Sequence, residues 1–238
     1  MIKRRFLNLD IENTTDEMFS ICFAITVCDE HEEISILLDN IIPFLAPQDE
    51  IIVQYDIENV TENVKNTISK YSEKISKSIG FPLNKDFGNF KNNLSKNTTK
   101  DYIFQIDADE IPSPYLLKNL HKIITCNKSI DLIRLPRVNI MIENDSDFLT
   151  WENETEIKPD ELVNFPDYQW RIYKNKKSIY WIKEIHEIIT GHKTMVYLPK
   201  EYKYSLLHCK KWEKQHRRWQ ESTQQENHWK THKKSTNN

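Results

Sequence analysis

The stretch YIFQIDADEIPSPYLL, residues 102–117, constrains the fold most strongly, because an apolar run ends directly in a cluster of acids. The run Tyr102–Ile106 is typical of a strand buried in a parallel sheet. Such a strand delivers the residues that follow it to the carboxyl edge of the sheet, where open α/β folds bind ligands. Asp107, Asp109 and Glu110 repel one another there unless a cation relieves the repulsion. The cluster is therefore either solvated or a metal site.

The context of this cluster is more informative than its spacing. An Asp-x-Asp triplet arises by chance about once in a chain of this size, and a second copy stands at Asp145–Asp147. No apolar run precedes that copy, so we interpret it as a solvated loop. After the first copy, Ser113 is a predicted cap for a helix over residues 115–124. A strand, an acidic turn and a helix together favour a ligand site at the first copy.

The chain alternates predicted strands and helices in its first half, as an α/β fold requires. Strands are predicted at 20–28, 50–55 and 102–107, with helices at about 34–44, from Thr61 through Ile75, and at 91–94. This order indicates a parallel sheet with right-handed crossovers. In the second half, we expect short strands of a mixed sheet within residues 131–138, 169–173, 178–182 and 201–208, interrupted by an acidic loop over 143–164.

The 238 residues suit one large α/β domain or two small ones. We expect a single domain over residues 1–211. No signal peptide or membrane span is visible, since the longest apolar run, 21–27, is far too short to cross a bilayer. The four cysteines show no metal-binding spacing and are most simply reduced thiols. These features predict a cytoplasmic protein.

The charge is unevenly distributed, although the formal net charge is only −3. Residues 10–63 contain no Lys or Arg, whereas residues 200–238 carry ten basic and four acidic side chains. We expect residues 212–238 to form a basic helix or tail. This segment is either solvated, or it docks onto a phosphate-bearing surface such as a membrane. Specific recognition of nucleic acid is not expected.

Glycine is scarce, because only Gly80, Gly88 and Gly191 occur in the chain. A P-loop or a dinucleotide-binding fingerprint needs several closely spaced glycines, so that the backbone can approach phosphate. Both motifs are therefore excluded. A nucleotide bound by this chain would need a metal ion to hold its phosphates.

The segments ITVCDEHEEISILLDNI, IIVQYD and YIFQIDADE, in this order, resemble the nucleotide-sugar half of a family 2, GT-A fold glycosyltransferase. The later segments FPDYQWRIYKN, IHEIITG and LLHCKKW are similar to the acceptor half of a subgroup acting on cell-surface or lipopolysaccharide-type glycans. The resemblance covers residues 20–212. It implies a Rossmann-like, mostly parallel sheet flanked by helices, with a donor half at 20–110 and an acceptor half with a small mixed sheet at 111–211.

The implied reaction moves a sugar from a nucleotide-diphosphate sugar to an acceptor hydroxyl, with inversion. The acceptor would be a glycan or a lipid-linked molecule. Thr26, Cys28, Glu30 and Asp56 would hold the nucleoside, and UDP is favoured because Asp56 can accept a hydrogen bond from a pyrimidine imide. Asp56 is equally well interpreted as a turn cap. The family often has Asn-Glu where this chain has Asp29-Glu30, and two acids where only Asp56 stands.

The resemblance also assigns a divalent cation, Mn²⁺ or Mg²⁺, to Asp107, Asp109 and His208. Hard carboxylate and phosphate oxygens suit these ions, and the cation would neutralise charge on the leaving diphosphate. Asp107 would also bind the ribose, while Lys91 and Arg171 could pair with phosphate or be ordinary surface cations. A lone His at a strand end, such as His208, is otherwise structural.

Transfer with inversion needs one general base near the acceptor hydroxyl. Glu187 follows an aromatic strand and stands where the family's catalytic acid is expected, so we prefer it over Asp167, which could instead cap a turn. His186 is a further possible ligand of the metal or diphosphate. A non-catalytic module that binds nucleotides or surfaces through its basic C-terminal segment is the alternative from another class.

Overall fold

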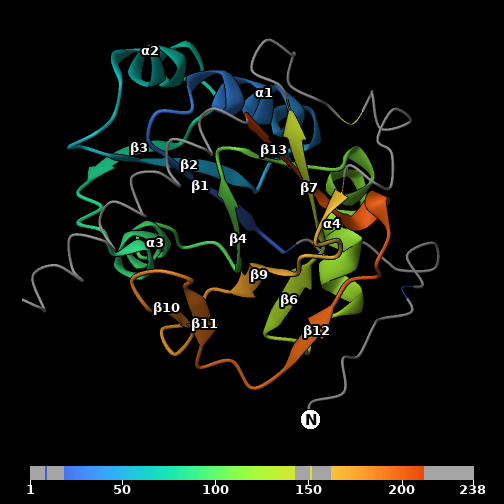
Figure 1. Cartoon of the computed structure of the whole chain (residues 1–238). Coiled ribbons are helices and arrows are strands. Elements are labelled where there is room, and N and C mark those ends of the chain that lie inside the picture. Colours follow the sequence, from blue (N-terminus) through green and yellow to red (C-terminus); the bar gives the residue numbers. More distant parts are fainter. Residues whose placement is uncertain (1–8, 10–18, 143–150, 152–161, 212–238) are drawn as a thin grey trace, which may run out of the picture.

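The computed structural model describes residues 9, 19–142, 151 and 162–211, and a seven-stranded sheet lies at their centre (Figure 1). The strand order is β12-β6-β9-β4-β1-β2-β3. The strands are β1 (Ile21–Val27), β2 (Glu50–Asp56), β3 (Lys77–Phe81), β4 (Tyr102–Asp107), β6 (Leu132–Leu135), β9 (Gln169–Lys174) and β12 (Met195–Tyr197). Strands β1, β2, β3 and β4 run parallel to one another, whereas β9 is antiparallel to both β4 and β6.

Helices cover both faces of this sheet (Figure 1). They are α1 (His31–Ile41), α2 (Glu62–Lys70), α3 (Phe87–Ser95) and α4 (Pro114–Cys126), with short 3-10 turns η1 (Ile42–Phe44) and η4 (Tyr202–Tyr204). Alternate residues of β1 point to opposite faces. Phe23 packs in one core cluster with α1, α2 and α4, and Ala24 packs in another with Leu94 of α3.

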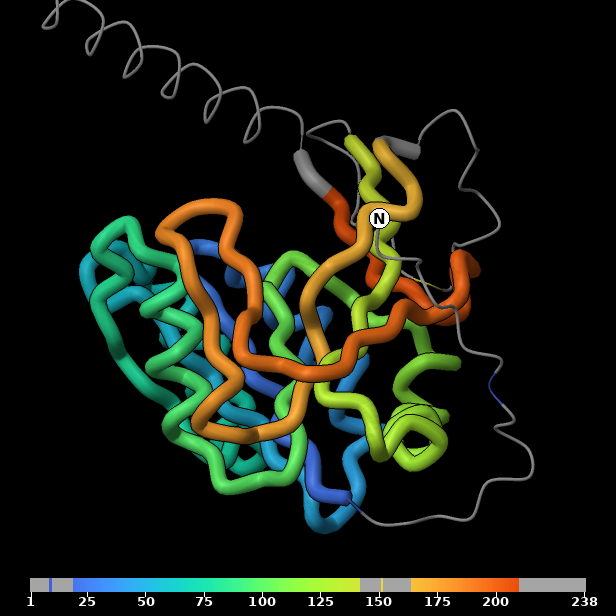
Figure 2. The backbone as a smooth tube through the Cα atoms, turned by 90° about the horizontal axis from the view of Figure 1, so that it is seen from below, coloured from blue at the N-terminus to red at the C-terminus, as the bar shows by residue number. Residues whose placement is uncertain are grey.

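Two smaller sheets complete the described fold. The hairpin of β10 (Tyr180–Ile182) and β11 (Ile188–Thr190) lies against α3 (Figure 2). A four-stranded sheet has the order β5-β13-β7-β8, formed by β5 (Glu110–Pro112), β13 (Leu206–Lys211), β7 (Arg137–Ile142) and β8 (Leu162–Val163). Among the described residues, no helix is long and apolar enough to cross a membrane.

The structure confirms the α/β fold class and the main capping predictions. The Thr61 side chain accepts a hydrogen bond from the Val64 amide, and Ser113 accepts one from Leu116, so that both residues begin their helices as predicted. The cysteines 22, 28, 126 and 209 form no disulfide bond with one another in the described structure. The basic segment 212–238, the second acidic triplet and most of the 143–164 loop lie outside the described residues.

Several sequence-based boundaries were wrong. The first helix begins at His31 and not at 34, and α2 ends at Lys70, so Ile75 lies beyond it. Strand β3 was not predicted, and α3 is longer than the expected 91–94. The strands of the second half do not all form a sheet of their own, because β6, β9 and β12 extend the main sheet.

Candidate active site

A cleft of about 710 Å³ opens at the carboxyl edge of the main sheet, where β1, β2 and β4 end. All eleven residues to which the sequence assigned donor, metal or catalytic roles line this cleft: Thr26, Cys28, Glu30, Asp56, Lys91, Asp107, Asp109, Asp167, Arg171, Glu187 and His208. Parallel strands bring their carboxyl ends to the same edge, so residues separated by up to 182 positions meet here. His186 lines the cleft as well.

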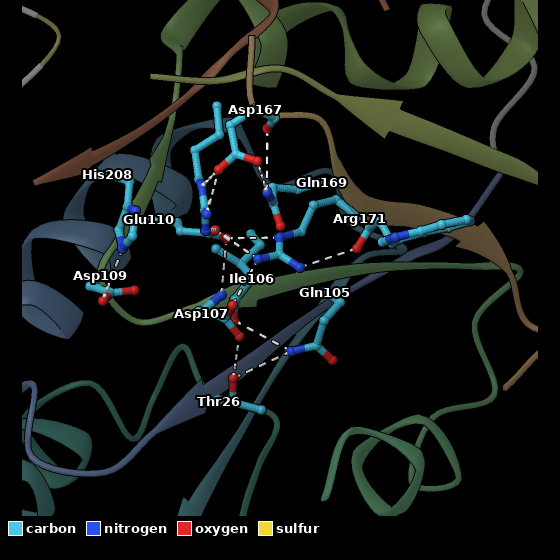
Figure 3. Close-up of polar contacts among 12 residues, drawn as sticks. Thr26, Gln105, Ile106, Asp107, Asp109, Glu110, Asp167, Gln169, Arg171 and His208 are labelled. Carbon is cyan, nitrogen blue, oxygen red and sulfur yellow. Dashed lines mark hydrogen bonds and ion pairs between the residues drawn. The ribbon is translucent and has the colours of Figure 1, made fainter. Parts of the chain in front are cut away.

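Asp107 ends β4 and accepts hydrogen bonds from three side chains, of which Figure 3 shows Thr26 and Arg171. Thr26 donates to one carboxylate oxygen at 2.9 Å, and Arg171 donates to the other at 2.7 Å. The Lys91 ammonium lies 3.1 Å from the same carboxylate. Burial alone would raise the pKa of Asp107, but the charges of Lys91 and Arg171 hold it well below its ordinary value. Asp107 is therefore a fixed anion with cationic neighbours.

Sequence reasoning missed a buried charge network behind Asp107. Glu110 is fully buried and accepts hydrogen bonds from Arg171 at 2.7 and 2.8 Å and from Arg137 at 2.9 Å (Figure 3). Burial alone would lower the pKa of Arg171, but the carboxylates of Glu110 and Asp107 raise it above its ordinary value. Arg171 is thus committed to two acids and is not an ordinary surface cation. Glu110 stood in the acidic cluster, but no local signal indicated its arginine partners.

Asp167 lies at the other end of this network. Its Oδ2 accepts from Arg137 at 2.6 and 3.0 Å and from Asn139 at 3.0 Å, while Oδ1 accepts from Gln169 at 2.8 Å. Burial acts to raise the pKa of Asp167, but Arg137 and the hydrogen bond from Asn139 hold it below its ordinary value. A carboxylate with this many donors is a weak proton acceptor.

Glu187 reaches the cleft from the hairpin, one residue before β11. Its Oε1 accepts from the Lys91 ammonium at 2.6 Å, and Lys91 is only 2% exposed. The same ammonium lies 4.9 Å from the centre of the Trp181 ring. Lys91 therefore joins Glu187 on the hairpin to Asp107 on β4. Lys183 and His186 in the connecting turn both have positive φ, +75° and +55°, an uncommon conformation that costs free energy in residues other than glycine.

Asp109 and His208 contact each other beside the network (Figure 3). The His208 Nε2 lies 3.2 Å from Asp109 Oδ2, and His208 is 3% exposed. Asp107 does not join this pair as a third ligand, and the described residues contain no group of three or more potential metal ligands. Carboxylate oxygen and imidazole nitrogen are nonetheless donors that Mn²⁺ accepts.

The residues predicted to hold the nucleoside also have partners within the protein. Both Asp56 oxygens accept hydrogen bonds, from the amides of Glu58 and Leu83 and from the Asn59 side chain. These contacts match the interpretation of Asp56 as a turn cap. Glu30 accepts from the amides of residues 28 and 29 and so shapes the loop after β1.

Apolar and aromatic residues complete the cleft lining. They include Phe87, Trp170, Trp181 and Ile185, of which Ile185 is 63% exposed and Phe87 40% exposed. None was predicted as a site residue, because an aromatic residue in a short strand is most often part of the core. The cleft therefore combines charged groups at the sheet edge with an apolar rim.

Comparison with known proteins identifies the fold. No protein-family model matches the sequence, and no curated protein is significantly similar to it. Residues 1–349 of S. aureus TarS in complex with UDP-GlcNAc align with a TM-score of 0.52 and 15% identity, over 82% of this chain and 59% of that one. The same fragment in complex with UDP aligns with a TM-score of 0.53 and 14% identity, over 81% of this chain and 61% of that one. This chain thus spans about three-fifths of that fragment. Its fold is the GT-A fold of glycosyltransferases, as the sequence resemblance implied.

Proposed function

We propose that this protein transfers a sugar from a nucleotide-diphosphate sugar to an acceptor hydroxyl, with the help of a divalent cation. One observation carries the proposal: six carboxylates and only three Lys or Arg side chains line a cleft at the ligand-binding edge of a GT-A fold. All three cationic side chains are already paired with acids. A diphosphate would be repelled from such a cleft unless a metal ion entered with it.

The donor set at Asp109 and His208 fits Mn²⁺, and these two residues would hold the ion together with diphosphate oxygens. When bound, the cation would act as a Lewis acid that stabilises the departing diphosphate. Thr26, Lys91 and Arg171 fix the carboxylate of Asp107. Asp107 would then accept a hydrogen bond from a ribose hydroxyl and orient the nucleotide sugar.

Glu187 is the proposed general base. Its carboxylate lines the cleft and, among the described residues, accepts a hydrogen bond from Lys91 alone, which fixes one oxygen and orients the group. Such a base takes the proton of the acceptor hydroxyl while that oxygen attacks the sugar carbon, which gives inversion. The lowered pKa of Asp167 supports a role in orienting Arg137 instead.

The finer assignments rest on the sequence resemblance. We propose UDP as the nucleotide, a glycan or lipid-linked molecule as the acceptor, and a cytoplasmic protein that contacts a membrane peripherally.

The test is a thermal-shift titration with UDP-sugars in the presence and absence of Mn²⁺. Ligands that bind only the folded state raise the unfolding temperature. We expect stabilisation that needs both components and that disappears in Asp109→Asn, with an unchanged unfolding temperature for the ligand-free variant. Equal stabilisation of wild type and Asp109→Asn would contradict the metal site, and release of UDP from the sugar would report turnover.

A further inference from the structure

Asn139 on β7 connects the two sides of the cleft. Its Nδ2 lies 3.0 Å from Asp167 Oδ2, and its Oδ1 lies 2.7 Å from His208 Nδ1. The strand register sets this geometry, because Asn139 and His208 are direct partners across the parallel β7–β13 pair. A continuous path of side chains therefore runs from Asp167 through Asn139 and His208 to Asp109.

The chemistry of donors and acceptors fixes the direction of each hydrogen bond in this path. An ionised carboxylate only accepts, so the amide group facing Asp167 must be the NH₂ of Asn139. The carbonyl oxygen of Asn139 then faces His208, and an oxygen that only accepts requires a proton on Nδ1 of the imidazole. The two ring nitrogens are thereby made different.

The consequence appears at the opposite side of the ring. With its proton on Nδ1, a neutral His208 presents the lone pair of Nε2 to Asp109 Oδ2 at 3.2 Å. Two lone pairs at this distance attract each other only when a positive charge lies between them, either a proton on Nε2 or a metal ion. Histidines that bind metals are usually oriented in this way, by a partner that accepts the proton of the other nitrogen.

We infer that Asn139 is a positioning residue, which presets His208 with Nδ1 protonated and Nε2 directed at Asp109 for a divalent cation. This inference rests on the proposed metal site. It also gives Asp167 a role, since Asp167 holds the Asn139 amide in the required orientation, and Arg137 in turn holds Asp167 through hydrogen bonds of 2.6 and 3.0 Å.

The tautomer of His208 can be measured without any metal. In the full chain labelled with ¹⁵N-histidine, a long-range proton–nitrogen correlation spectrum shows which ring nitrogen carries the proton. The spectrum is recorded at about pH 8.5, which is well above the ordinary histidine pKa of about 6.5. His208 is assigned by the loss of its signals in His208→Gln. We expect Nδ1–H in the wild type and a shift toward Nε2–H in Asn139→Ala. An Nε2–H tautomer in the wild type would overturn the inference.

Affinity for Mn²⁺ alone, measured by electron paramagnetic resonance, gives a second readout. Loss of a group that orients a metal ligand typically weakens metal affinity by about 10–100-fold, and we expect an effect of this size in Asn139→Ala. The control is Asn119→Ala, which removes a half-buried amide on α4 that donates, among the described residues, to the Tyr115 carbonyl. This control should bind Mn²⁺ as the wild type does.

The variants separate failure of the inference from failure of the proposed function. If Asp109→Asn and His208→Gln both bind Mn²⁺ normally, the proposed metal site is wrong. If these two variants lose binding while Asn139→Ala retains wild-type affinity, only the positioning role is wrong. Should Asn139→Ala fail to fold, the wild-type tautomer still decides the question.

Discussion

At the scale of single residues, the number of donors around each carboxylate separates the two candidate bases. Among the described residues, Asp167 accepts four hydrogen bonds, from Arg137, Asn139 and Gln169, whereas Glu187 accepts one, from Lys91. We expect Glu187→Gln to lower the transfer rate by roughly 10²–10⁴-fold and to leave donor affinity near that of the wild type. Single-turnover kinetics and equilibrium binding measure the two quantities.

Asp167→Asn is the matched variant, since it also exchanges a carboxylate for an amide. We expect a much smaller loss in rate and a measurable loss of stability, because Arg137 and Asn139 lose their charged partner. If the Asp167→Asn variant is inactive and the Glu187→Gln variant is active, Asp167 is the general base and Glu187 is not.

Glu110 is expected to matter for stability more than any exposed acid. It is fully buried between Arg137 and Arg171, and removal of one partner from a buried ion pair typically costs about 3–5 kcal/mol. Glu110→Gln should therefore lower the free energy of unfolding by several times the effect of Glu201→Gln. Glu201 pairs with Lys203 at 2.9 Å on the surface, where such pairs contribute roughly 0–1 kcal/mol. Urea unfolding measures both, and equal effects would show that the network is not stabilising.

At the scale of secondary-structure elements, local patterns predicted what local interactions determine. Strands β1, β2 and β4 were recognisable because both of their faces are buried, which demands a continuous apolar run. The edge strand β3, KSIGF, is largely exposed and has no such run. The insertion of β9 between β4 and β6 depends on pairing between distant segments, which no local pattern reports.

The same distinction applies to the site. Acids at the ends of parallel strands must meet at one edge, so the sequence placed Asp107 and Asp56 together correctly. The partners of Glu110 lie 27 and 61 residues away, on β7 and β9. Only the assembled sheets bring these charges together. The residue type alone does not indicate whether an acid will be buried or solvated.

Helix α3 holds the hairpin that carries Glu187, and Gly88 makes this contact possible. A Cβ atom at Gly88 would lie 2.6 Å from the Lys183 carbonyl oxygen, a backbone atom that cannot move aside alone. Asn92 adds two hydrogen bonds of 2.8 Å to the backbone of Trp181. We expect Gly88→Ala to displace the 183–187 turn, to raise hydrogen–deuterium exchange in residues 180–190 severalfold, and to reduce transfer.

Gly80→Ala is the control for this prediction. A Cβ atom at Gly80 meets only side-chain atoms, of Ile57 at 2.4 Å and Tyr55 at 3.0 Å, and the Ile57 side chain is 51% exposed and able to turn away. Exchange in 180–190 should stay at the wild-type level. If Gly88→Ala leaves exchange unchanged as well, the hairpin is not held by its close contact with α3.

Asp131 links the ends of three strands, β6, β9 and β12, and its contribution to the free energy of unfolding should depend on pH. Its carboxylate accepts from Lys176 and from the Lys193 amide, both at 2.9 Å. Burial acts to raise the pKa of Asp131, but these contacts lower it to about 2. A lowered folded-state pKa means stability that is present above the unfolded value of about 3.9 and is lost as the pH falls toward 2. Asp131→Asn should remove stability on the order of 2 kcal/mol at pH 7 and flatten the acid limb, as measured by urea unfolding at several pH values.

At the scale of the whole molecule, the predicted donor half and the predicted acceptor half share one sheet. Strands β3, β2, β1 and β4 come from residues before 111, and β9, β6 and β12 come from residues after it, joined where β4 pairs with β9. The last described strand, β13, ends at Lys211 and pairs with β5 and β7. Within the part of the chain that the structure describes, the strands that border the cleft all end before residue 212.

Removal of residues 213–238 should therefore leave the described fold and the donor site intact, while it weakens attachment to anionic surfaces. Six of the ten basic residues between 200 and 238 are lost with this segment, and attraction between exposed charges fades once ions screen them over about 8 Å near physiological salt. We expect the full chain to sediment with phosphatidylserine vesicles at low salt and to dissociate at high salt, and the truncated chain to bind much less. Both chains should unfold in a single transition with similar midpoints and bind UDP with Mn²⁺ equally. Loss of folding on truncation would show that the segment is structural, and equal vesicle binding would show that the basic tail has no role in docking.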